Sequence, residues 1–211
     1  CNAQNVTTDT PSNSFCTINT VYADDGNNLV TADFSEGATT MLSTNDGWKF
    51  GRGTFLLEAG KWYVEVKYTE TASFCGVVDI SQIVTSTSTS SVTLFGGSSG
   101  QPELFLNGSA QSDYSSAGTL SAGDIIQIAL DKDNNNVYFG KNGSWFGGTN
   151  WTESSPTTAH ALSSGSSYVH GFRAATGSGT RTNEWNFGNP PYSISSGNAD
   201  ANGHGNFEYA V

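Results

Sequence analysis

An alternation of side chains over residues 60–68, GKWYVEVKY, most constrains the fold of this chain. Trp62, Val64 and Val66 would share one face of an extended chain, and the side chains between them, including Glu65, would share the other. A period of two residues is typical of a β-strand with one face buried. The stretch therefore predicts a half-buried strand in an antiparallel sheet.

The rest of the chain repeats this signal. Apolar residues do not recur at helical spacing over two turns, and strand-like runs with turn residues between them follow roughly every ten residues. The composition of 25 glycines, 36% hydrophobic and 13% charged residues suits a β-rich protein with many turns. We therefore expect an all-β antiparallel sandwich. Further strands are predicted near residues 75–84, 92–97, 103–111, 124–133, 137–148, 166–176 and 182–188.

The net charge of the chain limits the classes of partner that it is expected to bind. Its 19 acidic and 8 basic residues give a net charge of −11. Binding to nucleic acid or to an anionic membrane requires clustered Lys and Arg, so both are poor partners. Membrane insertion is not expected either, because no apolar run approaches the roughly 18 residues of a spanning helix.

The cysteines and histidines predict neither a disulfide framework nor a metal site. Cys1, Cys16 and Cys75 are odd in number and widely spaced, and none forms a CxxC pair. Cys75 lies in an apolar run and is expected to be a small buried residue. A Cys1–Cys16 disulfide is left open. The three histidines lie far apart in sequence, outside the spacings of metal sites, and no cofactor is expected.

Residues 131–142 begin like a calcium-binding loop, with Asp131, Asp133 and Asn135 at alternate positions. Such a loop also requires glycine at its sixth position and glutamate at its twelfth, where this chain has Asn136 and Asn142. Strands rather than helices are expected on both sides. The stretch therefore predicts a β-hairpin turn, since Asn and Asp tolerate left-handed backbone conformations.

Three stretches in order resemble the SPRY domain family. They are RGTFLLEAGKWYVEVKY (residues 52–68), GDIIQIALDKDNNNVYFGKNGSWF (123–146) and WNFGNPPY (185–192). The resemblance implies a two-layer, bent antiparallel β-sandwich of the concanavalin-like jelly-roll type. It also implies a non-enzymatic module without a cofactor, whose loops at one rim hold a partner. The matching positions include Arg52, Asp124, Asp131, Phe139, Lys141, Asn142, Gly143 and Phe146.

Residues 9–19, together with the Thr, Ser, Asn and Gly bias, also resemble SPRY-bearing structural proteins of bacteriophages, particularly marine ones. This implies a location in a virion assembled in the host cytoplasm, with a homo-oligomer possible there. We expect an extended arm over residues 1–20, the sandwich over 21–195, and a tail over 196–211 that continues into a longer chain. The expected partner is a host surface glycan or another protein of the virion.

Five residues are predicted to bind that partner. Three tryptophans lie in Gly- and Asn-rich segments and could each stack on a sugar or anchor a peptide, or instead pack over the end of the sandwich. Two arginines flank the loop ATGSGTR, residues 175–181, which matches by position a partner-binding loop of the family. They could bind a carboxylate or form a solvated face. The five are Trp48, Trp145, Trp151, Arg173 and Arg181.

Two alternatives stay open. One is a cellular SPRY adaptor that binds a peptide. The other is a sandwich enzyme that degrades glycans, which needs two carboxyl groups facing each other across a sugar. Glu65, Glu70 and Asp79 are the nearest candidates, but no acidic pair shares one strand face, so an enzyme is not expected.

Overall fold

The computed structural model describes residues 14–20, 33–43, 49–68, 73–82, 90–96, 100–111, 114, 116–174 and 181–210. Apart from a short 3₁₀ turn at Tyr114 and Ser116, the regular elements within this part of the chain are β-strands. They are β1 (Asp33–Ser35), β2 (Thr40–Ser43), β3 (Lys49–Arg52), β4 (Lys61–Tyr68), β5 (Ser73–Asp79), β6 (Ser91–Gly96), β7 (Pro102–Leu106), β8 (Ser109–Gln111), β9 (Ile125–Asp131), β10 (Asn136–Lys141), β11 (Ser144–Phe146), β12 (Trp151–Glu153), β13 (His160–Ala161), β14 (Tyr168–Ala174) and β15 (Arg181–Asn186).

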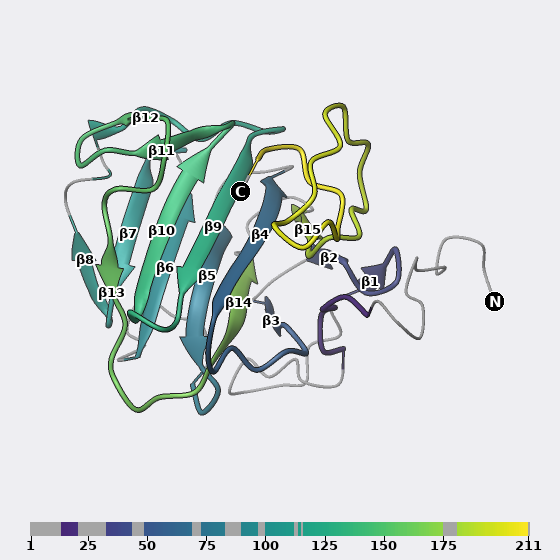
Figure 1. The fold of residues 1–211 in the computed structure, drawn as a ribbon, viewed down its shortest axis with the longest axis horizontal. Helices are drawn as coiled ribbons and strands as arrows, with labels where there is room; N and C mark the ends of the chain where they lie inside the picture. Colours follow the sequence, from purple (N-terminus) through teal and green to yellow (C-terminus); the bar gives the residue numbers. More distant parts are fainter. Residues whose placement is uncertain are drawn as a thin grey trace.

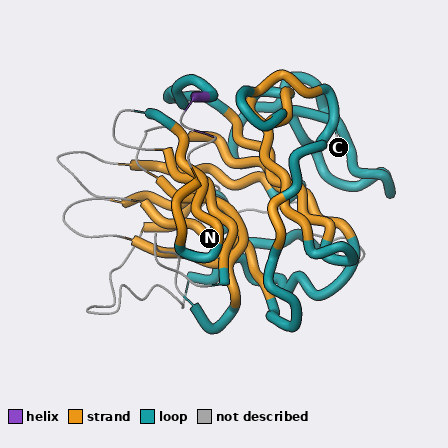
Figure 2. Tube along the Cα trace, turned by 90° about the vertical axis from the view of Figure 1, so that its left-hand side faces the viewer, coloured by secondary structure: helices purple, strands orange, loops and turns teal. Residues whose placement is uncertain are grey.

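These strands form two antiparallel sheets. The nine-stranded sheet has the order β1-β2-β15-β4-β9-β10-β11-β12, with β13 paired to β10, and the six-stranded sheet has the order β3-β14-β5-β6-β7-β8. Figure 1 shows the nine-stranded sheet in front, and the turned view of Figure 2 shows the strands as two layers. The predicted two-layer all-β sandwich is confirmed. The described residues contain no helix that could cross a bilayer.

The main core lies between the two sheets because alternate side chains of each strand point inward. On β4, Val64 and Val66 are fully buried in this core. Cys75 and Val77 face them from β5, and Trp185 of β15 is the largest of the fully buried side chains. The predicted strand and the buried Cys75 are therefore confirmed, but the expected exposure of the outer face of β4 is wrong, because Glu65 on that face is fully buried. Cys16 and Cys75 are both free thiols.

The acidic and asparagine-rich stretch is a hairpin turn, as predicted. Strands β9 and β10 are paired from Asp131 opposite Asn136, which leaves residues 132–135 as the turn. Asn135 has a left-handed φ of 54°, and the Asn134 amide donates to Oδ1 of Asp131 at 3.1 Å. The part of the chain described contains no group of three or more His, Cys, Asp and Glu residues that could hold a metal ion.

The motif residues at the other end of this hairpin form a hydrogen-bonded network. Nδ2 of Asn142 donates to Asp124 at 2.7 Å, and the Ile125 amide donates to Oδ1 of Asn142 at 2.8 Å. Lys141 Nζ lies 3.7 Å from the same Asp124 carboxylate. The network ties the start of β9 to the end of β10, so these residue types have a structural role.

Described segments near both ends of the chain pack on the sandwich. Near the N-terminus, Cys16 and Ile18 are buried, and Ile18 forms a bridge with Gly53 just after β3. Near the C-terminus, Glu208 and Tyr209 lie over the face of the nine-stranded sheet that points away from the core, where the end of the chain is seen in Figure 1. The predicted boundaries at residues 20 and 195 stay predictions, although parts of the arm and tail pack on the sandwich.

Candidate functional site

A cavity of about 250 Å³ opens where the edge of the six-stranded sheet becomes irregular. Beyond β3, the Gly53 amide donates to the His170 carbonyl, and the Leu57 amide donates to the Tyr168 carbonyl. From Gly53 to Leu57 the edge segment advances four residues, while β14 advances only two, from His170 to Tyr168. The additional backbone of the edge segment forms a bulge. We call this cavity the Arg52 pocket; it is lined by Asn19, Arg52, Gly53, Thr54, Leu56, Ile80 and Val169.

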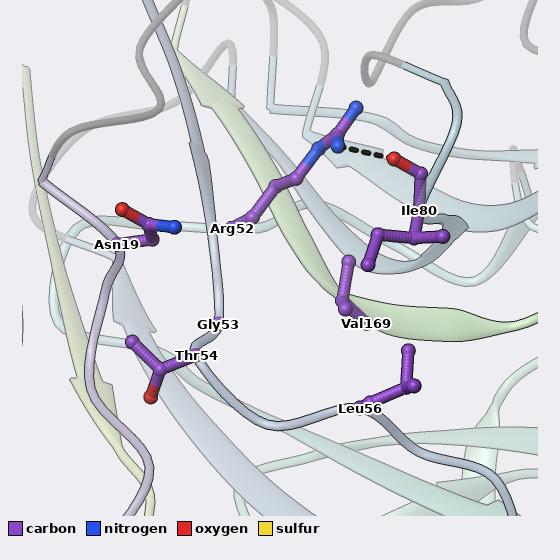
Figure 3. A pocket seen from close by; sticks show the side chains of 7 residues that line it. All are labelled: Asn19, Arg52, Gly53, Thr54, Leu56, Ile80 and Val169. Atoms are coloured by element: carbon purple, nitrogen blue, oxygen red, sulfur yellow. Dashed lines mark hydrogen bonds between the residues drawn. The ribbon is translucent and has the colours of Figure 1, made fainter.

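The pocket has an apolar side and a polar side (Figure 3). Leu56, Ile80 and Val169 lie on one side, and Asn19 and Thr54 lie on the other. Leu56 and Ile80 are 40% and 47% exposed, and they are the exposed large hydrophobic residues of the described chain. Their presence beside one cavity distinguishes this site from the rest of the described surface, because exposed apolar side chains gathered together mark interaction sites.

Arg52 holds the loop that presents Ile80. Its Nη1 donates to the Ile80 carbonyl at 2.5 Å, and its Nη2 donates to the Gln82 carbonyl. Only 6% of Arg52 is exposed, so a planar guanidinium that donates to two carbonyls fixes the loop better than a flexible ammonium would. The position of Ile80 at the pocket therefore depends on Arg52.

Asp79 supplies the negative charge next to this arginine. Burial alone would raise the pKa of Asp79, but hydrogen bonds from Ser81 and the charge of Arg52 outweigh it and lower the pKa. The Ser81 amide donates to Oδ1 of Asp79 at 2.8 Å. The Asp79 carboxylate therefore stabilises the loop at the end of β5 through these hydrogen bonds.

The five residues predicted to bind a partner do not form one site. Trp145 and Trp151 lie on the neighbouring strands β11 and β12. Arg181 begins β15, which is separated from β11 by β4, β9 and β10. Arg173 lies in β14 of the other sheet, opposite Phe50 and Phe74. Trp48 lies outside the described residues. Partner binding by these residues stays a prediction.

Both described tryptophans pack against other rings. Trp145 is 4% exposed and lies 6.5 Å from the ring of Tyr63. Trp151 is partly buried and packs edge-on against Tyr114 and Phe146, which stack on each other, with centroid distances of 5.5 and 5.4 Å. Trp145 therefore packs against the sandwich instead of facing solvent, whereas Trp151 is only partly buried.

The candidate carboxylates of an enzyme are not paired. Glu65 lies on β4 of the nine-stranded sheet, and Asp79 ends β5 of the other sheet. Glu65 is fully buried and accepts hydrogen bonds from Asn186 and from the amides of Glu208 and Tyr209. Each carboxylate therefore has its own structural partners. Glu70 lies outside the described residues.

The sequence does not predict the Arg52 pocket. It indicates Arg52 only as a motif position and places Ile80 in the strand expected near residues 75–84, and it assigns no role to Leu56. One usable signal existed, since Phe55-Leu56-Leu57 breaks the period of two and so places one side chain outside the core.

Solved structures with a similar fold were compared with this chain. The chain is similar to the SPRY domain of human HERC1, with a TM-score of 0.51, 16% identity, and coverage of 70% of this chain and 87% of that one. It is also similar to the TRIM65 PSpry domain, with a TM-score of 0.60, 17% identity, and coverage of 82% and 92%. The chain has the SPRY fold. No protein-family model and no curated protein sequence matches it.

The likeness to these SPRY domains is one of fold, since their sequence identities to this chain are 16% and 17%. It agrees with the resemblance drawn from the strand motifs. A shared fold does not assign a function, which has to be argued from the site.

Proposed function

We propose that the chain is a non-catalytic protein-binding module and that the Arg52 pocket takes an apolar side chain of the partner. The observation that carries this proposal is the exposure of Leu56 and Ile80 together on the apolar side of one cavity. Full burial of such a side chain is favourable by about 1.5–3 kcal/mol, and since Leu56 and Ile80 are 40% and 47% exposed, covering them gains roughly half of that each. The SPRY fold supports a binding role.

The size of the pocket favours a side chain over a separate small molecule. Its volume of about 250 Å³ falls below the range of roughly 300–1,000 Å³ usual for small-molecule sites. Its polar side, with Asn19 and Thr54, would fix the main chain on either side of the inserted group. A partner segment with one aliphatic residue between polar neighbours fits this lining.

The setting of the module remains part of the proposal. The partner would be another virion protein or, as the second candidate, a host surface glycan bound at Trp151. The partly exposed ring of Trp151 at β12 favours that second candidate, because aromatic rings stack on sugars. A virion location and a cellular adaptor are alternatives for the same pocket.

A two-armed binding experiment separates these candidates. The full chain is screened against a displayed random-peptide library and against an array of bacterial surface glycans. Every hit is then repeated with Leu56→Asp, Ile80→Asp and Trp151→Ala. We expect saturable peptide binding that falls at least ten-fold in both pocket variants and is unchanged in Trp151→Ala.

Two results would overturn this assignment. Peptide binding that survives both pocket variants would place the protein site elsewhere. Glycan binding that is lost only in Trp151→Ala would replace the pocket with the β12 surface as the functional site. Because Leu56 and Ile80 are exposed, their substitution should leave the unfolding transition within about 0.5 kcal/mol of the unchanged protein.

A further inference from the structure

Glu65 lies at the centre of the nine-stranded sheet, on the face away from the core. Its side chain is fully buried, and its two oxygens accept five hydrogen bonds. Two of the donors are main-chain amides from near the C-terminus, those of Glu208 at 3.0 Å and Tyr209 at 2.8 Å. A buried carboxylate without donors would be unstable, so these amides matter to Glu65. The other donors are Tyr63 at 3.1 Å, Asn186 at 3.0 Å and Tyr192 at 3.4 Å.

The segment that supplies the two amides is only lightly attached. Most side chains over residues 192–210 are exposed, and the buried ones are Tyr192 and Phe207. The Phe207 ring meets the edge of Tyr63 with centroids 5.1 Å apart. In Figure 1 this segment crosses in front of β4 and ends over β9. A segment with few buried apolar contacts opens at a lower free-energy cost than the core does.

The face beneath the segment carries further recognition groups. Gln127 of β9 is directly opposite Glu65 and is 1% exposed. Its Oε1 accepts from the Gly143 amide at 2.7 Å, and its side chain also interacts with the hydroxyl of Tyr63. A side-chain amide beside a carboxylate offers both a donor and acceptors to the main chain of a polypeptide.

We propose that this outer face is a second binding surface, specific for an extended polypeptide, and that the segment 192–210 occupies it as a displaceable strap. The partner is a protein segment that presents two consecutive main-chain amides to Glu65 and an aromatic ring to Tyr63. Residues 207–209 show that chemistry in the chain's own occupant. The surface belongs to the nine-stranded sheet, so the proposal does not depend on the Arg52 pocket.

The strap must be displaced by mass action. A covalently linked segment acts at an effective concentration of the order of millimolar. A partner segment with the same contacts would therefore bind weakly unless it also contacts the sandwich elsewhere. The strap thus selects for partners with extended contacts and excludes short, unrelated peptides.

The test uses the full chain, folded before it is cut. A protease site is inserted between Ala201 and Asn202, which are exposed in a turn, and is cleaved after purification. A fluorescent peptide with the sequence of residues 203–211 is then added. We expect one labelled peptide per protein to replace the native segment. We expect at least ten-fold weaker binding in Glu65→Gln and unchanged binding in Glu103→Gln, which alters a carboxylate on β7 of the other sheet.

Several outcomes would overturn the proposal. A native segment that stays bound without exchange over a day would be an integral part of the fold. A segment that leaves and does not rebind would show that the face is no receptor, and equal binding by Glu65→Gln would remove the assigned anchor.

If Glu65→Gln fails to fold, amide hydrogen exchange in the unaltered chain shows whether the strap opens separately from the sandwich. The amides of Glu208 and Tyr209 should exchange at least ten-fold faster than those of β4 and β9. Equal protection of both sets would contradict a strap that opens separately from the sandwich.

Discussion

His170 is a buried histidine whose environment disfavours its charged form. It faces Trp185 and Phe187, with ring centroids 6.4 and 5.7 Å away, and burial lowers its pKa to about 4 from an ordinary value of 6.5. Between these pH values the unfolded chain binds a proton that the folded chain does not. Stability contributed by neutral His170 is therefore complete above pH 6.5 and is lost as the pH falls towards 4.

This predicts a loss of roughly 3 kcal/mol from this residue across the interval, at 1.36 kcal/mol per tenfold change in proton affinity. Urea unfolding of the unaltered chain and of His170→Gln, compared at pH 7 and pH 4.5, measures it. The difference in stability between the two proteins should shrink at the lower pH. A difference independent of pH would show that His170 is readily protonated in the folded state.

Replacing Arg52 by lysine tests whether the planar geometry of the guanidinium, rather than its positive charge, holds the loop. Lysine at this position keeps the positive charge beside Asp79 but cannot donate to the carbonyls of Ile80 and Gln82 in the same planar arrangement. Leaving a buried carbonyl unsatisfied costs about 1–3 kcal/mol. Arg52→Lys should therefore destabilise the chain by about that amount in denaturant unfolding, and faster exchange of the Ile80 amide should accompany it. Unchanged stability and exchange would mean that other contacts hold the loop.

Among the elements, the turn between β10 and β11 contacts the strap through Gly143. Gly143 has a left-handed φ of +85°, and a Cβ there would lie 2.9 Å from the Tyr209 ring. Gly123 has a similar φ of +92° with no atom within 4 Å of a Cβ. Substituting both glycines by alanine introduces the same backbone strain, but only the substitution at Gly143 also disturbs the contact with the strap.

Alanine at either position should cost about 1–2 kcal/mol from the left-handed backbone. Gly143→Ala should also increase hydrogen exchange at the Tyr209 amide by roughly ten-fold, because the ring must move. Gly123→Ala should leave that exchange unchanged. Equal exchange rates in the two variants would show that the Tyr209 ring does not hold the strap in place.

The strands were predictable from the sequence where one face is buried. The alternation along β4 and the turn between β9 and β10 each follow from local chemistry, so they could be predicted without tertiary information. Glu65 could not be assigned in this way. Alternation places it on the outer face, and only the return of Glu208 and Tyr209 from far along the chain buries it. The Arg52 pocket likewise depends on Asn19, Arg52 and Ile80 meeting across separate segments.

At the scale of the whole molecule, the net charge of −11 is mostly uncompensated. The ion pairs of the described residues include Lys67 with Glu184 and Lys141 with Asp124, both at 3.7 Å. Partly exposed pairs of this kind contribute at most about 1 kcal/mol each. Repulsion among acidic groups should therefore outweigh attraction in the folded state.

Raising NaCl from about 10 mM to 200 mM shortens the Debye length from roughly 30 Å to below 10 Å. The melting temperature should rise by a few degrees over this range, as scanning calorimetry at constant pH would measure. A fall in melting temperature would indicate that the two ion pairs, or others like them, dominate over the general repulsion.

The contact between Glu65 and the C-terminal amides also constrains the order of folding during synthesis. The Glu208 amide lies 143 residues beyond Glu65 in the chain. At about 5–20 residues per second, a ribosome needs roughly 7–30 s to make that interval. During this time the nascent sheet holds a carboxylate without two of its donors. Folding to completion is thus delayed until the last strands and the amides that follow them have been translated.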